Sequence, residues 1–291
     1  MLHEIAITNG VFEPKEIDNA PARKEVLKKV LRERCDDNGR RLCNMYDGKW
    51  KNAVDRQVEG SSWLGDNVRT ALKILYDRGR LIPRHAESAS PPRDDIAWLG
   101  EALESHRRLP FYAILTKAET RTKYSYKKPI ADCTDLDSSP ESPLWNSVSR
   151  SVTVDRTAKE MAEAVAPLLR TCRSLLLIDP YLNPKLYRFR HPIREFLESA
   201  IKQRYDSKDP SLIEIHTSAK VFHNGSTFLD SAKQISKDLP SGLSVNLVCW
   251  RERESGPTLH NRYILTNHAG VVFPHRLDEK SHDSDDIVLL D

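Results

Sequence analysis

The sequence has few of the features that mark metal, disulfide or membrane proteins. Its five cysteines, spread over 291 residues, include no C-x-x-C pair, which argues against a zinc ribbon or a disulfide framework and predicts reduced thiols. No apolar run approaches the length of a membrane span, and the first residues lack the basic start and apolar stretch of a signal peptide. We therefore expect a soluble, cytoplasmic protein.

The chain also lacks a strong charge of either sign. Its 45 basic and 42 acidic residues leave a net charge of +3, so affinity for a polyanion must come from local patches. One candidate patch interleaves cations, which can neutralise backbone phosphates, with tyrosines, which can stack on bases. A solvated linker with incidental lysines fits the same composition. The candidate nucleic-acid-binding residues are Arg121, Lys123, Lys127 and Lys128, beside Tyr124 and Tyr126.

Hydrophobic periodicity divides the chain into three parts. Residues 1–117 predict a mixed α/β, largely helical region with strands at Leu2–Thr8 and Phe111–Leu115 and no catalytic constellation. These strands either form a small sheet of their own or join a sheet further along the chain. Residues 118–150 lose the periodicity and end in an acidic stretch with Ser and Pro, as expected of a linker. Residues 151–291 are regular again.

The C-terminal part alternates helical and strand patterns. A capping box, Thr157 to Glu160, opens a helix, and Pro192 is expected to start another. The short apolar run Ser174–Ile178 predicts a strand buried on both faces. This order is typical of an α/β sandwich with a mainly parallel sheet. Further strands are predicted at Leu212–Ile215, Leu243–Trp250, Gly270–Phe273 and Ile287–Leu290, with a helix near Thr227–Leu239.

A candidate catalytic motif lies in the segment Thr258–Phe273. It consists of His260, Arg262 and Asn267, in the spacing H-x-R-x-x-x-x-N. On a strand, His260 and Arg262 point to the same face. An imidazole can attack phosphorus, and a guanidinium can hold two phosphate oxygens as charge develops on them. A histidine and an arginine two residues apart also fit a solvated strand face or a structural hydrogen bond.

This motif resembles the phospholipase D superfamily motif H-x-K-x-x-x-x-D. His260 matches the family nucleophile, Arg262 stands at the lysine and Asn267 replaces the aspartate. The family's downstream Gly-Ser-x-Asn is absent. The chain continues as Pro274–Glu279 instead, which is closer to the phospholipase-D-like C-terminal domain of MIT-domain proteins, regarded as non-catalytic. The resemblance covers residues 151–291 and implies the phospholipase D fold.

Other candidate residues follow the predicted strands, because ligands gather at the carboxyl ends of parallel strands. Asp179 and Tyr181 follow the first strand, and they fit a simple turn as well as a site. After the third strand, Arg251 and Arg253 are candidate phosphate clamps or a solvated rim, and Glu252 is a candidate partner that orients the imidazole of His260.

The resembling mechanism needs two histidines, one to attack phosphorus and one to protonate the leaving oxygen. Single-motif family members pair two copies, so the resemblance implies a homodimer with His260 from each subunit at a shared site. Within one chain the alternatives are His216, His223, His268 and His275. The histidines lack the close ligand pairs of structural zinc. The family reaction is metal-independent, so we expect no metal and no cofactor.

Two functions follow. One is a phospholipase-D-like phosphodiesterase, a metal-independent nuclease on DNA or RNA, for which the resemblance allows a setting in anti-phage defence. The other is a catalytically inactive module that binds a phosphorylated ligand, nucleic acid or a partner protein, alone or within a larger complex. Retention of His260 and Arg262 favours the enzyme, whereas Asn267 and the missing Gly-Ser-x-Asn favour the module.

Overall fold

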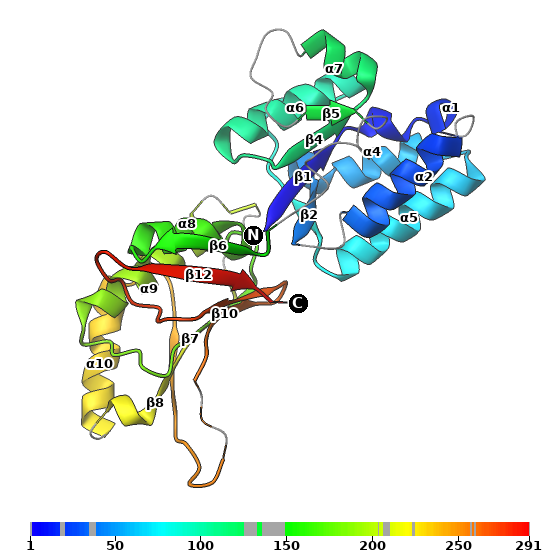
Figure 1. Ribbon diagram of the computed structural model, residues 1–291. Coiled ribbons are helices and arrows are strands. Elements are labelled where there is room, and N and C mark those ends of the chain that lie inside the picture. The colour runs from blue at the N-terminus through cyan, green and yellow to red at the C-terminus, as the bar shows by residue number, and fades with distance from the viewer. Residues whose placement is uncertain are drawn as a thin grey trace. The chain divides into compact units, whose positions relative to one another are not determined.

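The chain forms two compact units, Leu2–Ser149 and Arg150–Asp291. The computed structural model describes residues 2–17, 21–34, 39–124, 133–135, 149–202, 204–205, 210–222, 225–256, 258 and 260–290. Each unit has its own sheet with helices packed on it (Figure 1). Within these ranges, no helix is both long enough and apolar enough to cross a membrane.

The N-terminal unit is built on a parallel sheet with the strand order β3-β2-β1-β4-β5. From β1 the chain first moves outward to β2 and β3, and then crosses back to β4 and β5. Right-handed crossovers in two opposite directions place helices on both faces of the sheet, with α5 on one side and α6 on the other (Figure 1). The strands thus form a sheet of their own. They are β1 (His3–Ile7), β2 (Arg40–Asn44), β3 (Leu81–Pro83), β4 (Ala113–Thr116) and β5 (Cys133–Asp135).

Local capping explains where the two longest helices of this unit begin. The Ser61 side chain accepts from the amide of Leu64 at 3.3 Å, and Asp94 accepts from Ala97 at 2.8 Å. Both α7 and β5 fall in the range expected to be a linker, of which 125–132 and 136–148 lie outside the described residues. The helices are α1 (Pro14–Ile17), α2 (Pro21–Lys29), α3 (Met45–Gly48), α4 (Trp50–Gln57), α5 (Ser62–Asp77), α6 (Asp95–Arg108) and α7 (Ala118–Tyr124).

Buried charges connect the first strands of the N-terminal unit. The carboxylate of Glu4 in β1 accepts from Arg41 in β2 at 2.8 Å and from Arg84, just after β3, at 2.7 Å. All three side chains are almost completely buried. Arg84 also lies over the ring of Phe111, 3.8 Å from its centre. Charges taken out of water must be paired in this way, so the network fixes how the three strands align.

His3 makes the stability of the N-terminal unit sensitive to acid. Burial, with positive charge nearby that includes Arg40, lowers the pKa of His3 from 6.5 to about 4. Between these two values the unfolded chain binds a proton that the folded unit does not, so stability falls as the pH drops through this window. Urea unfolding of wild type and His3→Gln at pH 7 and pH 4.5 should show a smaller loss in the variant. An equal loss in both proteins would contradict the assignment.

The C-terminal unit contains a mixed sheet with the order β6-β12-β11-β10-β7-β8-β9. The α/β class is therefore confirmed, but the expected mainly parallel sheet is wrong for this unit. Only β7, β8 and β9 run parallel, because helices connect them, while the consecutive strands β10, β11 and β12 pair antiparallel. The strands are β6 (Ser151–Asp155), β7 (Ser174–Ile178), β8 (Leu212–Ser218), β9 (Asn246–Trp250), β10 (Arg262–Thr266), β11 (Gly270–Phe273) and β12 (Ser284–Leu289).

Helices α8 (Ala158–Leu169), α9 (Tyr187–Ile201) and α10 (Gly225–Asp238) lie along one side of these strands (Figure 1). The predicted cap of α8 is present, because Thr157 accepts from the amide of Glu160 at 3.2 Å. Helix α9 begins before Pro192, which lies inside the helix and does not start it. The packing against the sheet includes an edge contact between Phe196 and Phe273, whose ring centres are 6.1 Å apart.

The opposite face of the C-terminal sheet is only partly covered. Leu175 and Leu177 are fully buried, whereas the alternate residues Leu176 and Ile178 are half-buried. The prediction that β7 is buried on both faces was therefore wrong. Strand pairing puts Tyr263 beside Ile178 and Leu265 beside Leu176. Tyr263 and Leu265 are also half-buried, so these four side chains form an apolar strip on this face.

Candidate functional site

A hollow of about 460 Å³ lies at the carboxyl ends of the parallel strands β7 and β8. Its lining comes from segments far apart in the chain: the turn after β7, the first turn of α9, the end of β8, and the loops before β10 and after β11. This is the position at which α/β sheets bind ligands. The lining residues that matter here are Tyr181, Phe189, Lys220, Glu252, His260 and Arg276.

His260 is the candidate nucleophile, and it lines this hollow. It lies in the loop before β10, which starts at Arg262, so His260 and Arg262 do not share one face of a strand as expected. The side chain is exposed, and its Nε2 is hydrogen-bonded to the hydroxyl of Thr258. Among the lining residues His260 is the one histidine. An exposed imidazole in a concave site can reach a substrate atom without a change in the fold.

Two arginines lie against the ring of Tyr181. The guanidinium carbons of Arg262 and Arg276 are each 5.0 Å from the ring centre, within the range of a cation–π contact. Arg262 also donates to the carbonyl of Pro274 at 3.4 Å, and its buried Nε has no hydrogen-bond partner among the described residues. Arg262 therefore lies beside the hollow, behind a residue that lines it, whereas Arg276 lines the hollow itself.

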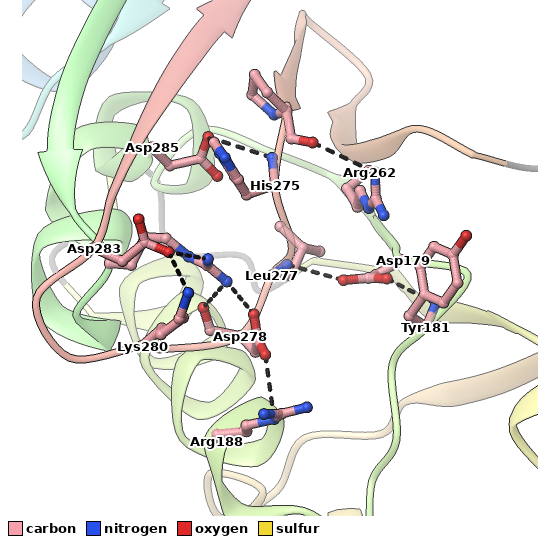
Figure 2. Close-up of polar contacts among 12 residues, drawn as sticks. Asp179, Tyr181, Arg188, Arg262, His275, Leu277, Asp278, Lys280, Asp283 and Asp285 are labelled. Atoms are coloured by element: carbon pink, nitrogen blue, oxygen red, sulfur yellow. Dashed lines mark hydrogen bonds and ion pairs between the residues drawn. The ribbon is translucent and has the colours of Figure 1, made fainter.

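Asp179 is a fully buried carboxylate that positions two segments of the site. It accepts from the amide of Tyr181 at 2.8 Å and from the amide of Leu277 at 2.9 Å (Figure 2). Burial raises the pKa of Asp179, while the two amides and the charge of Arg262 oppose that shift. By holding both amides, the carboxylate connects the turn that carries Tyr181 to the loop that carries Arg276.

A second buried carboxylate, Asp278, anchors the same loop. Arg156 is hydrogen-bonded to it, and Arg188 approaches it at 3.2 Å (Figure 2). Arg156 reaches Asp283 as well, at 2.8 Å. These contacts fix the loop that follows β11, and so they set where the guanidinium of Arg276 lies.

Asn267 does not lie with His260. It follows the last residue of β10, and its side-chain oxygen accepts from the amides of Arg173 and Ser174, at 2.6 and 3.2 Å, where β7 begins. Because a five-residue strand is roughly 17 Å long, Asn267 and His260 lie at opposite ends of β10. Asn267 therefore fastens one strand to its neighbour and touches no part of the hollow.

The three residues predicted after β9 separate into two groups. Glu252 lines the hollow with His260, and it forms an ion pair with Lys220 across the wall. Arg251 and Arg253 line a second hollow, which Glu252 also borders. Glu252 is thus paired with a lysine, and among the described residues no hydrogen bond or ion pair joins it to the imidazole of His260.

His216, an alternative second histidine, is committed to other contacts. Its Nδ1 accepts from the indole of Trp250 at 2.8 Å, so the ring proton must be on Nε2, which faces the carboxylate of Glu214 at 2.9 Å. His275 is bound to Asp285 at 3.0 Å, and His268 to the side chain of Asn267. His223 lies outside the described residues.

The predicted nucleic-acid patch belongs to the N-terminal unit. Arg121 and Lys123 are in α7, and both lie on partly or fully exposed positions. Lys127 and Lys128 lie outside the described residues. Over the residues that are described, no three His, Cys, Asp or Glu side chains are grouped so that they could hold a metal ion.

The positive charge of the hollow comes from Arg276, Arg188 and Lys220, none of which was predicted as a site residue. They come from loops and a helix start that meet only in the folded unit. Arg276 lies in the segment after β11, where the phospholipase D superfamily carries its downstream motif, and that position was the one available signal.

Comparisons with known proteins add little to this geometry. No family model matches the chain, and no curated protein matches it. Among solved structures, polyphosphate kinase from Porphyromonas gingivalis is similar with a TM-score of 0.32 and 10% identity. That match covers 48% of this chain, which spans only 22% of the kinase. The archaeal chromatin protein TrmBL2, whose structure shows a novel mode of DNA binding, gives a TM-score of 0.25 and 11% identity over 78% of this chain and 74% of its own. Both likenesses are weak, and neither bears on the chemistry of the site.

Proposed function

We propose that the C-terminal unit is a phospholipase-D-like phosphodiesterase that cleaves nucleic acid without a metal ion, with His260 as the nucleophile. The observation that carries the proposal is the exposed imidazole of His260 in a hollow that also contains the guanidinium of Arg276. Arg276 has no carboxylate partner among the described residues, so its charge is available to a phosphate. A nitrogen nucleophile beside an available guanidinium is what attack on a phosphodiester needs.

In the proposed reaction, a ring nitrogen of His260 forms a bond to phosphorus while the bond from phosphorus to the leaving oxygen breaks. The leaving oxygen takes a proton, and water then displaces the histidine from phosphorus to restore the enzyme. Arg276 stabilises charge on the phosphoryl oxygens. Arg262 acts through the ring of Tyr181, and Asn267 keeps β10 aligned with β7; both are positioning residues.

The first step needs a proton donor, and His260 is the only histidine that lines the hollow in the described chain. The donor is proposed to be His260 of a second copy, so that the working enzyme is a homodimer with one shared site. Arg121 and Lys123, with Lys127 and Lys128, are proposed to contact the nucleic-acid backbone. A role in anti-phage defence stays a prediction from the resemblance alone.

One observation favours the inactive binding module as the second candidate. The ion pair between Lys220 and Glu252 lowers the positive charge on one wall of the hollow. A site with one available guanidinium and one imidazole can hold a phosphate without breaking it.

The deciding experiment is an assay of wild-type protein on end-labelled single-stranded DNA and RNA in the presence of EDTA. The proposal predicts shortened products from at least one substrate, because no metal takes part. Binding of the same oligonucleotides with no product over many hours would remove the enzyme and leave the module. Products that form only when a divalent metal replaces EDTA would contradict the proposed chemistry.

A further inference from the structure

A second hollow, of about 510 Å³, opens on the sheet face that the helices do not cover. Its floor consists of Leu176, Ile178 and His216, which share this face because β7 and β8 are paired in register. Trp250, at the end of β9, and the loop up to Gly256 form its wall. The volume lies in the range of small-ligand sites and can take a nucleobase.

Trp250 presents a flat aromatic surface that is held in place. Its indole N–H donates to Nδ1 of His216 at 2.8 Å, and the two rings are stacked with centres 5.7 Å apart and planes 15° from parallel. His216 is fixed in turn by Glu214. Even so, Trp250 as a residue stays 52% exposed, which is unusual for a tryptophan. A rigid, exposed ring is prepared for stacking because little side-chain entropy remains to be lost.

Two cations lie beside this ring. Arg251 and Arg253 line the same hollow and are exposed, and neither guanidinium has a hydrogen bond or ion pair to another described residue. The acid between them, Glu252, is already paired with Lys220. Cations without an internal partner next to an exposed aromatic ring are the features by which proteins bind single-stranded nucleic acid.

The second hollow adjoins the first. Glu252 borders both, and Ile178 on the floor of the second is followed two and three residues later by Pro180 and Tyr181, which line the first. We propose that a base of single-stranded nucleic acid stacks on Trp250 and that the neighbouring phosphates contact Arg251 and Arg253, while the phosphodiester to be cleaved lies at His260. This inference rests on the proposed function and narrows its substrate to single strands, because a paired base cannot stack on the indole.

The apolar strip on the same face would also suit a protein partner. The observations favour nucleic acid, because two unpaired arginines at the rim are costly to bury against an apolar partner. Burying these arginines against phosphates carries no such cost, because each phosphate supplies the negative charge that pairs with a guanidinium.

The test is the affinity of full-length protein for a labelled twelve-nucleotide oligothymidylate, measured by fluorescence anisotropy in EDTA. Phosphorothioate linkages in the oligomer keep the backbone charge and slow its cleavage. Trp250→Ala should weaken binding roughly 5- to 150-fold, the loss expected for one stacked base. Trp250→Phe, which keeps an aromatic plane, should weaken it much less. On an oligomer that carries abasic sites, wild type and Trp250→Ala should bind alike, which a merely electrostatic or structural role for the indole would not produce.

The outcomes separate this inference from the function on which it rests. If wild type cleaves or binds the oligomer and Trp250→Ala binds it with the same affinity, the stacking site is wrong. The proposed function is not affected by that result. If Trp250→Ala changes the native mass of the protein but not its affinity for the oligomer, this face binds a protein partner. That result also contradicts the stacking site. If Trp250→Ala fails to fold, wild type and Trp250→Phe are compared instead. For each protein, the affinity for the oligothymidylate is divided by the affinity for the oligomer with abasic sites. A ratio near one in both proteins contradicts the inference.

Discussion

Replacing His260 with asparagine should lower the rate of oligonucleotide cleavage by about a thousand-fold or more, the usual cost of removing a nucleophile. Asparagine has similar bulk and polarity but no nitrogen that can attack phosphorus. His260 is exposed, and among the described residues its side chain is hydrogen-bonded to Thr258 alone, so the C-terminal unit should keep its melting temperature. Single-turnover rates and thermal unfolding, measured on the same preparations, check both parts of this prediction.

The matched control is His282→Asn. His282 is also an exposed histidine of the C-terminal unit, it does not line the hollow, and its φ of +57° is one that asparagine tolerates. Cleavage by this variant should equal that of wild type. Equal losses in the two variants would show that any histidine change damages the protein, and full activity in His260→Asn would end its assignment as nucleophile.

Mixtures of wild-type and His260→Asn subunits test the shared site. If each site needs an imidazole from both copies, an equal mixture of freely exchanging subunits should keep about one quarter of the wild-type activity, because only that fraction of dimers has both histidines. Independent sites would keep about half, which would contradict the shared site.

The order of elements in the C-terminal unit was predictable because each element has a local pattern. The run Ser174–Ile178 is bounded as predicted, and the capping box at Thr157 forms. The direction of the strands was harder to predict from the sequence. Which strands run antiparallel depends on the short connections from β10 to β12 and on the return of β12 to β6, and these are non-local choices.

The N-terminal sheet was harder to predict for a physical reason. Strand β2 reads Arg-Arg-Leu-Cys-Asn, a sequence that looks exposed. It is buried because Glu4, from a strand far along the chain, neutralises Arg41. Pattern analysis assumes that charged residues face water, and it fails where a distant partner removes the cost of burial.

The candidate site shows the same division. His260 could be named as a candidate from the sequence because it and its neighbours form a spacing within one segment, and the folded unit places it in the hollow. Arg276 has no such signature, since its position depends on Leu277 reaching Asp179 and on Asp278 reaching Arg156. The spacing also grouped Asn267 with His260, although a strand carries residues seven apart to its two ends.

Replacing Arg156 with methionine should produce the largest loss of stability in the C-terminal unit. The Arg156 side chain is 5% exposed and contacts the carboxylates of Asp278 and Asp283, of which Asp278 is also buried. Removing Arg156 leaves the buried Asp278 with the half-exposed Arg188 as its remaining cation. Breaking a buried ion pair in this way costs about 3–5 kcal/mol. For a unit of this size we expect a fall in melting temperature of roughly 10–20 °C, measurable by calorimetry.

Lys280→Met is the matched control, because Lys280 also contacts Asp283, at 3.1 Å, but is 65% exposed. It removes the same charge and should change the stability of the unit by no more than about 0.5 kcal/mol. The double variant Arg156→Met with Asp278→Leu should recover part of the loss, since it also removes the buried carboxylate that Arg156 no longer neutralises. Equal effects of Arg156→Met and Lys280→Met would show that the buried pair does not anchor the loop of Arg276. If the anchor is real, Arg156→Met should also weaken oligonucleotide binding below its melting temperature, because the loop that carries Arg276 then loses one of its attachments.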